Sequence, residues 1–429
     1  MNFLFVNIPR ENAEEKKFFE GLYNFLLENN HSISLCTDLY DPHELDKRIK
    51  KYYIPRKNLH QISKMHLINR RFYLNTFTNR KLRKFNKFLN KVNETASFFV
   101  NFLVFRNKKY EWISNYDETS QLEFEKLTRS LISKNSIYGF RKLQKIINDI
   151  IIKNCIDYVI VFNSVDHLQF LGKLISDFYN LNFINYERSD YVGKFYKESH
   201  SFHYKSDLMS LEENSDEFKI EEYLNHFEES QNSVLKNLYG YRNNQDLRNI
   251  NVVKPKNKKI VFIPMDNIAF TGWAHKNTDS IKDYSGLPSP KETLKLIDKN
   301  IDYEKYEVYL KPHPGCLIVD KNFIPNNFIF YDGKIENIIH NTDVLIGFKS
   351  KLNLVFYYAN VPIIQLLKSP FTKFEIFKYS SINNLQKNLN DIKFTQSAQH
   401  KKFLSYFYKI YCVNEQDNIS FFKNNIIRD

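Results

Sequence analysis

Short, uninterrupted apolar runs recur along both halves of this chain and alternate with stretches of helical periodicity. Apolar runs without polar alternation are typical of strands buried on both faces, as in a parallel sheet covered by helices. We place such strands at residues 3–6, 32–36, 158–162, 183–186, 259–264, 306–310, 328–331, 343–346 and 361–365. The chain is therefore predicted to be an α/β protein with two doubly wound, Rossmann-like sheets.

The segments between these strands predict helices and a division into two domains. Helices are expected at residues 13–28, 140–153, 165–179, 291–301, 335–340 and 352–359, and the end of the chain looks mainly helical. An amphipathic helix with an acidic face, within 212–238, should pack on the first half and lead into a polar linker at 243–258. We therefore place an N-terminal Rossmann-like domain at 1–250, with a basic helical insertion at about 40–135, and a C-terminal Rossmann-like domain with closing helices at 251–429.

Glycine and cysteine usage excludes several classes of protein. The ten glycines are never spaced as in G-x-G-x-x-G or G-x-x-x-x-G-K-[ST], so fingerprint-bearing dinucleotide enzymes and Walker-type NTPases are excluded as first interpretations. The four cysteines lie far apart, which favours a reducing compartment. The start has no signal-peptide pattern, and no run of about 18 apolar residues could span a membrane, so we expect a cytoplasmic protein or one attached peripherally to a membrane.

The formal net charge of +13 is concentrated in one segment. Fifteen Lys or Arg residues and no Asp or Glu lie between Lys47 and Lys91, interleaved with aromatic residues, so the rest of the chain is slightly acidic. Three interpretations stay open: a solvated basic insertion, a surface that meets an anionic membrane or a lipid-linked substrate, and a nucleic-acid-binding segment. No recognised nucleic-acid motif accompanies the segment, so nucleic acid is the least favoured partner.

The first segment suited to binding an anion is Lys311-Pro312-His313-Pro314. It directly follows the strand at 306–310, so Lys311 and His313 should lie at the carboxyl end of that strand. The prolines fix the backbone, and a lysine beside an imidazole suits a phosphate group. The alternative is a rigid turn whose histidine caps a neighbouring helix.

The second such segment is NTDVLIGFKSKLN, residues 341–353. Gly347 permits a tight turn after the strand, and Ser350 falls where a helix should begin. Lys349 and Lys351 add positive charge beside it. Ser350 is therefore expected to cap the helix, and the same region could also receive phosphate oxygens.

Taken in order, three segments resemble those of the bacterial capsule and lipopolysaccharide polysaccharide glycosyltransferases, a group that includes capsule Kdo transferases and polysialyltransferase-like enzymes. The segments are IPMDN at 263–267, YLKPHP at 309–314 and NTDVLIGFKSKLNLVFYYANVPII at 341–364. The resemblance is specific over about 259–366 and only architectural over the first half. It implies the GT-B architecture, in which two Rossmann-like domains face a cleft and are closed by C-terminal helices. Wall teichoic acid glycerophosphotransferases share a similar His-Pro and Ser-helix pattern, so these motifs do not fix the donor.

The resemblance also implies roles for single residues. In such enzymes, the histidine of the His-Pro motif and the later Ser or Thr hold the donor nucleotide's phosphate, and His313 and Ser350 occupy these places here. Lys311 matches the basic residue that precedes them. Asp266 and Asn267 end the strand at 259–264 and are expected either to contact nucleotide or sugar, or simply to cap.

The family also places an acid in the N-terminal domain, just after a strand. Glu187 follows the strand at 183–186 and is the candidate general base, which would accept a proton from the acceptor hydroxyl. Asp190 is a competing acid, and Ser189 stands where the family usually has glycine. The alternative is a surface Glu187 paired with Arg188.

These features predict a glycosyltransferase that moves a sugar from a nucleotide-activated donor, with CMP-Kdo or CMP-sialic acid favoured, to a capsule or lipopolysaccharide glycan. A teichoic-acid-type glycerophosphotransferase, a UDP-hexose transferase and a non-enzymatic nucleic-acid-binding protein acting through residues 47–91 are the alternatives. No cofactor or metal is expected, because protein cations would offset the charge on the leaving phosphate. We expect a lipid-linked or oligosaccharide acceptor and a peripheral location on the inner face of the cell membrane, with acceptor or membrane contacts through Arg70, Arg71, Arg80, Lys81, Arg83 and Lys84.

Overall fold

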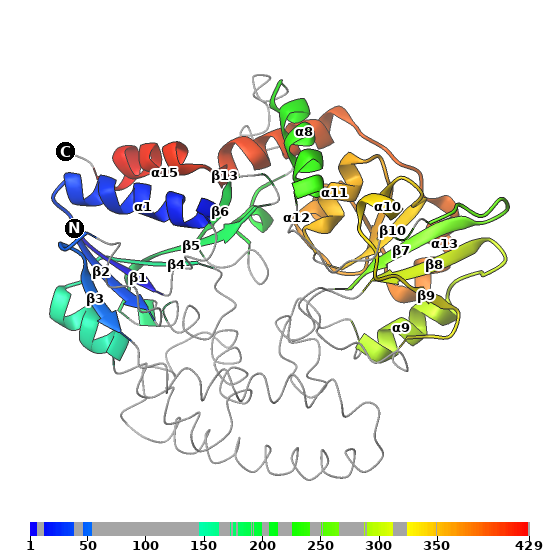
Figure 1. The fold of residues 1–429 in the computed structure, drawn as a ribbon, viewed down its shortest axis with the longest axis horizontal. Coiled ribbons are helices and arrows are strands. Elements are labelled where there is room, and N and C mark those ends of the chain that lie inside the picture. The colour runs from blue at the N-terminus through cyan, green and yellow to red at the C-terminus, as the bar shows by residue number, and fades with distance from the viewer. Residues whose placement is uncertain are drawn as a thin grey trace, which may run out of the picture. The chain divides into compact units, whose positions relative to one another are not determined.

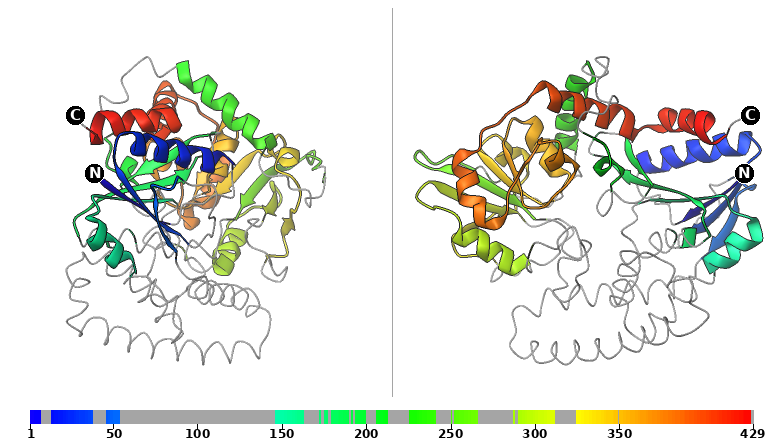
Figure 2. Two further views of the ribbon diagram at one scale, coloured as in Figure 1. Left: turned by 60° about the vertical axis from the view of Figure 1, so that its left-hand side comes forward. Right: turned by 180° about the vertical axis from the view of Figure 1, so that it is seen from behind.

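The computed structural model describes residues 1–427 except 7–12, 38–45, 54–145, 163–171, 173–174, 177–178, 190, 192, 200–205, 213–224, 241–249, 251, 266–286, 288–289, 312–323 and 349. The chain divides into two compact units. Unit 1 comprises Met1–Glu187, Lys197–Ser201 and Asn414–Asp429, and unit 2 comprises Arg188–Tyr196 and Phe202–Val413. The strands form two sheets, which are shown from three sides in Figure 1 and Figure 2.

The first sheet has seven strands in the order β13-β6-β5-β4-β1-β2-β3. Their bounds are β1 Asn2–Val6, β2 Ser32–Thr37, β3 Lys50–Tyr53, β4 Tyr158–Phe162, β5 Asn182–Arg188, β6 Phe195–Glu198 and β13 Cys412–Val413. β1 pairs in parallel with β2 on one side and β4 on the other, whereas β13 pairs antiparallel with β6. Read from β3 to β6, the strand order is 3-2-1-4-5-6, which is the Rossmann order.

The second sheet has six strands in the order β12-β11-β10-β7-β8-β9. Their bounds are β7 Lys259–Pro264, β8 Tyr306–Lys311, β9 Phe328–Phe330, β10 Val344–Gly347, β11 Ile363–Gln365 and β12 Lys378–Tyr379. Counted from β7, this is again the order 3-2-1-4-5-6, and β7 pairs in parallel with β8 and β10. The prediction of an α/β chain with two Rossmann-like sheets is confirmed.

Helices connect and cover the strands, as the sequence periodicity predicts. Their bounds are α1 Ala13–Glu28, η2 Asp207–Met209, α8 Asn225–Gly240, α9 Pro290–Lys299, α10 Glu336–Ile339, α11 Leu352–Tyr358, α12 Pro370–Lys373, η7 Ile382–Asn384, α13 Leu385–Asp391, α14 Ala398–Tyr406, η8 Phe407–Tyr411, α15 Glu415–Phe421 and η9 Phe422–Ile426, with a further helical stretch at 146–154. The predicted C-terminal helices are confirmed. No helix in the described ranges combines the length and the apolarity needed to cross a bilayer.

The apolar runs are continuous because the central strands are buried on both faces. Every residue from Phe3 to Val6 in β1 and from Ile260 to Ile263 in β7 is completely buried. Burying a side chain of this size contributes about 1.5–3 kcal/mol. The central strands thus anchor each sheet, and their carboxyl ends are rigid platforms for the loops that follow.

The C-terminal segment completes unit 1 rather than unit 2. In Figure 1, α15 lies alongside α1, and both belong to unit 1. The Tyr186 hydroxyl donates to Oδ1 of the buried Asn418 at 2.5 Å, and the Phe3 and Phe422 rings lie 5.9 Å apart. A Cβ at Gly21 in α1 would meet the side chain of Glu415 in α15, so the two helices lie in contact at this position. The chain therefore returns to its first unit after building the second.

The observed division differs from the predicted boundary at residue 250. The acidic helix, α8, belongs to unit 2, because its buried Phe227 and Val234 join the apolar core that also contains Leu354 of α11 and Leu404 of α14. The expectation that it packs on the first half is wrong. Part of the predicted polar linker belongs to unit 2. Val252 is buried in its core, and the Val252 carbonyl oxygen accepts a hydrogen bond from Nδ2 of Asn341.

The predicted basic insertion begins later than residue 40, because Lys50 and Lys51 belong to a strand of the first sheet. Lys50 to Tyr53 make up β3, which pairs in parallel with β2 at the edge of the first sheet. Charged residues are common on edge strands, where they oppose pairing with another chain. The remainder of the insertion, 54–135, lies outside the described residues.

One hydrogen-bond arrangement occurs in both units, at the amino ends of the central strands. The Asp157 carboxylate accepts the backbone N–H of Asn2 at 2.7 Å, and the Asp157 N–H donates to the Asn2 carbonyl at 2.9 Å. The Asp343 carboxylate accepts the N–H of Ile260 at 2.8 Å, and the Asp343 N–H donates to the Ile260 carbonyl at 2.9 Å. Each aspartate immediately precedes the fourth strand of its sheet, β4 or β10, and so ties that strand to the first one, β1 or β7.

Removing the Asp343 carboxylate should destabilise unit 2. Ile260 is completely buried, so Asp343→Ala would leave its N–H without an acceptor, at a cost of about 1–3 kcal/mol. The midpoint of denaturant unfolding, followed by circular dichroism, measures this loss. Lys254→Ala is the control, since it removes only the exposed ammonium 2.6 Å from the same carboxylate and should shift the midpoint far less. Equal shifts for the two variants would contradict the prediction.

Candidate active site

The candidate site lies at the carboxyl edge of the sheet in unit 2. The strand order reverses between β7 and β10, and ligands of doubly wound sheets bind outside the carboxyl ends of the strands at such a point. β8 and β10 lie on either side of β7 and end at Lys311 and Gly347. Lys311 is in register with Pro264, the last residue of β7. Lys311 and the segment with Ser350 therefore flank the end of β7.

Lys311, the last residue of β8, is only 8% exposed. Its ammonium donates to the carbonyl oxygen of Gly333 at 2.6 Å and lies 5.5 Å from the centre of the Tyr331 ring. Burial lowers the pKa of Lys311, and the carboxylates of Asp332 and Glu336 act in the opposite direction. An ammonium has three donors, so one hydrogen bond to the backbone leaves donors for a bound oxygen.

The lowered pKa of Lys311 predicts a pH dependence of stability. Between that lowered pKa and the ordinary value of 10.5, the unfolded chain binds more protons at this lysine than the folded chain. Stability should therefore rise with pH in this window. Lys311→Met has no titrating group, so the difference in melting temperature between wild type and variant should move in favour of the wild type as the pH rises toward 10.5. A difference that stays constant with pH would contradict the prediction.

Gly347 provides space for a neighbouring side chain. It is not among the described residues with a positive φ, so the turn after β10 does not use the left-handed backbone that favours glycine. A Cβ at this position would lie 2.5 Å from Oδ1 and 2.6 Å from Nδ2 of Asn353. Asn353 is 1% exposed and donates from Nδ2 to the Phe348 carbonyl at 3.1 Å. Because Gly347 has no side chain, the Asn353 amide can lie against it and hydrogen-bond to the Phe348 carbonyl.

The N-cap residue of α11 is Lys351, which makes no side-chain capping hydrogen bond, so the prediction that Ser350 caps this helix is wrong. Ser350 instead lies one residue before it. Its hydroxyl oxygen accepts the N–H of Leu352 at 3.3 Å, and its carbonyl oxygen accepts the N–H of Asn353 at 3.1 Å. The hydroxyl proton is directed elsewhere, because the oxygen acts as the acceptor in this bond. Ser350 therefore combines a structural hydrogen bond with a donor that is available at the carboxyl edge of the sheet.

Lys351 is oriented by other parts of unit 2. Its ammonium donates to the carbonyl oxygen of Arg188 and lies 5.0 Å from the centre of the Tyr196 ring. The positive charge predicted beside Ser350 is thus held between a backbone carbonyl and an aromatic face.

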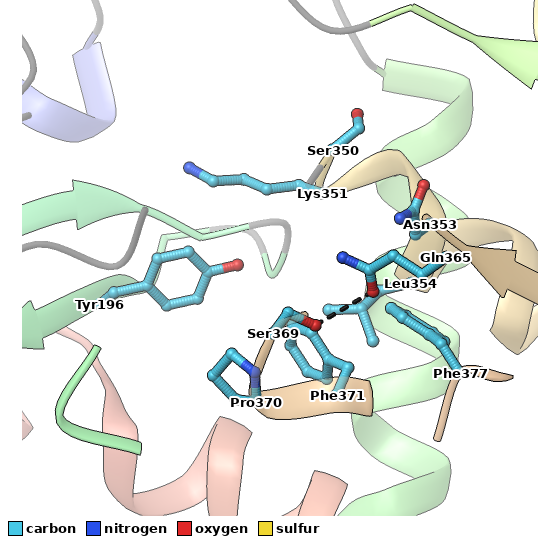
Figure 3. A pocket seen from close by; sticks show the side chains of 10 residues that line it. All are labelled: Tyr196, Ser350, Lys351, Asn353, Leu354, Gln365, Ser369, Pro370, Phe371 and Phe377. Carbon is cyan, nitrogen blue, oxygen red and sulfur yellow. Dashed lines mark hydrogen bonds between the residues drawn. The ribbon is translucent and has the colours of Figure 1, made fainter. Parts of the chain in front are cut away.

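A small cavity adjoins Ser350, between the ends of β10 and β11 (Figure 3). Its space is about 370 Å³ with the open mouth included. Leu354, Pro370, Phe371 and Phe377 form its apolar part. Gln365, the last residue of β11, is 1% exposed, and its Oε1 accepts a hydrogen bond from the Ser369 hydroxyl at 3.0 Å.

Glu187 lies near the end of β5 and belongs to unit 1. Its side chain is buried, at 7% exposure, so the surface position that the alternative interpretation required is not observed. Its role as general base stays a prediction.

Several predicted site residues lie outside the described residues: His313, Lys349, Asp190, Asp266, Asn267, and the basic residues Arg70, Arg71, Arg80, Lys81, Arg83 and Lys84. Among the side chains that the structure does place, no group of three His, Cys, Asp or Glu could hold a metal ion. Independence from metal and cofactor remains a prediction.

Sequence reasoning missed three polar residues beside the cavity: Gln365, Ser369 and Asn353. A signal for Gln365 exists, because a polar residue ends the apolar run at 361–365, at the carboxyl end of a strand. Ser369 is identifiable from the Ser-Pro-x-Thr pattern of a helix start, and the structure shows a complete capping box there. No local pattern indicates that Tyr196 joins the same cavity.

Comparisons with known proteins bear on the fold. No family model matches the chain, and no curated protein matches it. Similar solved structures include KpsC of Thermosulfurimonas dismutans, a beta Kdo 2,4 transferase, at 10% identity over 62% of this chain and 86% of that one, with a TM-score of 0.42. A KpsC beta Kdo 2,7 transferase of the same organism has 12% identity over 72% of this chain and 97% of that one, with a TM-score of 0.41. A glycosyltransferase from Rickettsia africae ESF-5 has 10% identity over 100% of this chain and 99% of that one, with a TM-score of 0.37. All three scores lie below 0.5, so the fold rests on the strand orders of the chain itself.

Proposed function

We propose that this chain is a GT-B glycosyltransferase that moves a sugar from a nucleotide-activated donor to a glycan acceptor. The observation that carries the proposal is the position of Lys311 and Ser350 in unit 2. Lys311 ends β8 and Ser350 follows β10, on either side of the end of β7, at the reversal point of a sheet with the Rossmann order. Nucleotide ligands bind at this place in doubly wound sheets.

The proposed chemistry is electrostatic at the donor and acid–base at the acceptor. The Lys311 ammonium, the Ser350 hydroxyl and His313 would bind the donor phosphate and offset the charge that develops as it leaves. No metal ion is needed for this role in the proposal. Glu187 would accept the proton of the attacking hydroxyl.

The finer assignment rests on the sequence motifs. Their resemblance to capsule and lipopolysaccharide enzymes supports CMP-Kdo or CMP-sialic acid as the donor. It also supports a capsule or lipopolysaccharide glycan as the acceptor. The basic segment at 47–91 would approach a lipid-linked acceptor or the anionic inner face of the membrane.

A thermal-shift series with CMP, CDP and UDP tests the proposal, because a ligand that binds only the folded state raises its melting temperature. CMP should give the largest rise, and Ser350→Ala should reduce it. A rise with CDP alone would favour glycerophosphotransfer, and a rise with UDP alone would favour hexose transfer. If no nucleotide stabilises the chain while nucleic acid binds with a steep salt dependence, the proposal is overturned in favour of a nucleic-acid-binding protein.

A further inference from the structure

Lys351 links the start of α11 to a turn that lies far from it in the sequence. It is the N-cap residue of α11 and directly follows Ser350. Its ammonium donates to the carbonyl oxygen of Arg188 and lies 5.0 Å from the centre of the Tyr196 ring. Figure 3 shows its side chain extending from the start of α11 toward the side on which Tyr196 lies. A hydrogen bond from a charged donor is stronger than one between neutral groups, so this contact restrains the Arg188 peptide.

The two residues that Lys351 contacts are the ends of one short segment. Arg188–Tyr196 runs from the end of β5 into the start of β6 and belongs to unit 2. Glu187, the residue before it, belongs to unit 1. Inside the segment, the Ser189 N–H donates to the Lys194 carbonyl at 3.0 Å and closes the turn. Lys351 therefore holds both ends of a closed turn whose first residue is bonded to Glu187.

The place of Glu187 depends on this restrained peptide. β4 ends at Phe162, which is in register with Tyr186 of β5. Glu187 and Arg188 therefore extend beyond the end of β4. The Glu187 side chain is buried, and a movement of the Arg188 carbonyl is passed to it through a single peptide unit. A catalytic group displaced by about 1 Å can lose about 100-fold in rate, so a restraint at this peptide matters for catalysis.

We propose that Lys351 is a positioning residue, which holds Glu187 in place for proton transfer by binding the Arg188 carbonyl. The inference rests on the proposed function, in which Glu187 accepts the proton of the acceptor hydroxyl. Neighbouring residues at the start of α11 then have different tasks. Ser350 binds the donor phosphate, and Lys351 acts on the backbone beside the base.

Lys351→Met tests the proposal, because it keeps the aliphatic side chain and removes the ammonium. It should lower kcat about 100-fold, while the Kd of the bare nucleotide stays unchanged. Nucleotide release by the full chain from CMP-Kdo, CMP-N-acetylneuraminic acid, CDP-glycerol and UDP-glucose gives kcat, and titration calorimetry with CMP, CDP and UDP gives Kd. Lys351→Arg still offers a charged donor to the carbonyl and a planar group to the Tyr196 ring, so it should recover most of the lost rate.

A double variant distinguishes positioning from a general structural role. If Lys351 acts through Glu187, then Lys351→Met should cost almost no further rate in a Glu187→Gln background, because residues that act as a unit are not additive. Single-turnover rates over long incubations measure the slow variants. A structural role elsewhere in unit 2 would instead lower the rate by the same factor in both backgrounds.

Lys373→Met is the matched control. The Lys373 ammonium also donates to backbone carbonyls of unit 2, those of Met209 at 3.0 Å and Leu211 at 2.5 Å. It also lies near an aromatic ring, 5.7 Å from the centre of Phe374. This variant loses the same kinds of contact away from β5, so it should keep the wild-type kcat. Rates are compared at a temperature at which circular dichroism shows all variants folded.

The outcomes separate the inference from the proposed function. If CMP, CDP and UDP all fail to bind, or no donor is turned over, the proposed function falls and the inference falls with it. If a donor is turned over, four results overturn the inference alone: an unchanged kcat for Lys351→Met, a weakened nucleotide Kd in its place, an equal loss for Lys373→Met, or additivity with Glu187→Gln.

Discussion

Replacing His313 by alanine should lower the rate of sugar transfer about 100- to 1,000-fold, the loss that follows removal of one donor that stabilises transition-state charge. The reason is the position of His313 in the sequence, two residues after Lys311, the last residue of β8. An imidazole there would donate a proton or a hydrogen bond to the leaving phosphate. Initial rates at saturating donor, measured with radiolabelled nucleotide-sugar, give the comparison.

The control for this variant is His340→Ala. His340 is exposed in unit 2 and follows α10, so the same substitution there should leave the rate unchanged. Both variants should keep the wild-type melting temperature, which separates a catalytic loss from an unfolded protein. Near-normal turnover by His313→Ala would remove His313 from the mechanism.

The second large effect is expected for Gly347→Ala. The added Cβ would lie 2.5–2.8 Å from the amide atoms of Asn353, whose side chain is buried and short. Overpacking of this kind costs about 1–3 kcal/mol. The displaced segment also contains Ser350, so nucleotide binding should weaken together with stability. Denaturant unfolding and the nucleotide thermal shift measure the two losses.

A double variant isolates the collision. Asn353→Ala removes the side chain that the new methyl would meet, so adding Gly347→Ala to it should cost little further stability. Asn353→Ala alone should itself destabilise, because it removes the hydrogen bond to the Phe348 carbonyl. If the two substitutions are additive, Gly347 is required for another reason than the space for Asn353.

The central strands could be read from the sequence because burial on both faces makes their residues uniformly apolar. β1, β4, β7 and β8 begin and end within about one residue of the predicted positions, and such runs are typical of parallel sheets. β3 was missed because Lys50 and Lys51 belong to an edge strand, where charge is tolerated. β13 is two residues long and exists through its pairing with β6, which no local pattern encodes.

The candidate site was predictable where it depends on the ends of strands. Lys311 and Ser350 follow apolar runs, so their place at the carboxyl edge could be derived from the sequence. The orientation of the Gln365 amide could not, because it depends on the hydroxyl proton of Ser369 and hence on the capping box with Thr372. The burial of Glu187 could not either, since its strand continues two residues beyond the last apolar position that the sequence shows.

The packing of α15 on α1 has a consequence for synthesis of the protein. Residue 414, where the last segment of unit 1 begins, follows the end of α1 at residue 28 by 386 positions. At roughly 5–20 residues per second, a ribosome needs about 20–80 s to cover this distance. Throughout that time the nascent α1 lacks the helix that covers it, and a chaperone could bind there. The unit that is made first is thus completed last, and fragments that stop before residue 414 leave its first helix with an uncovered face.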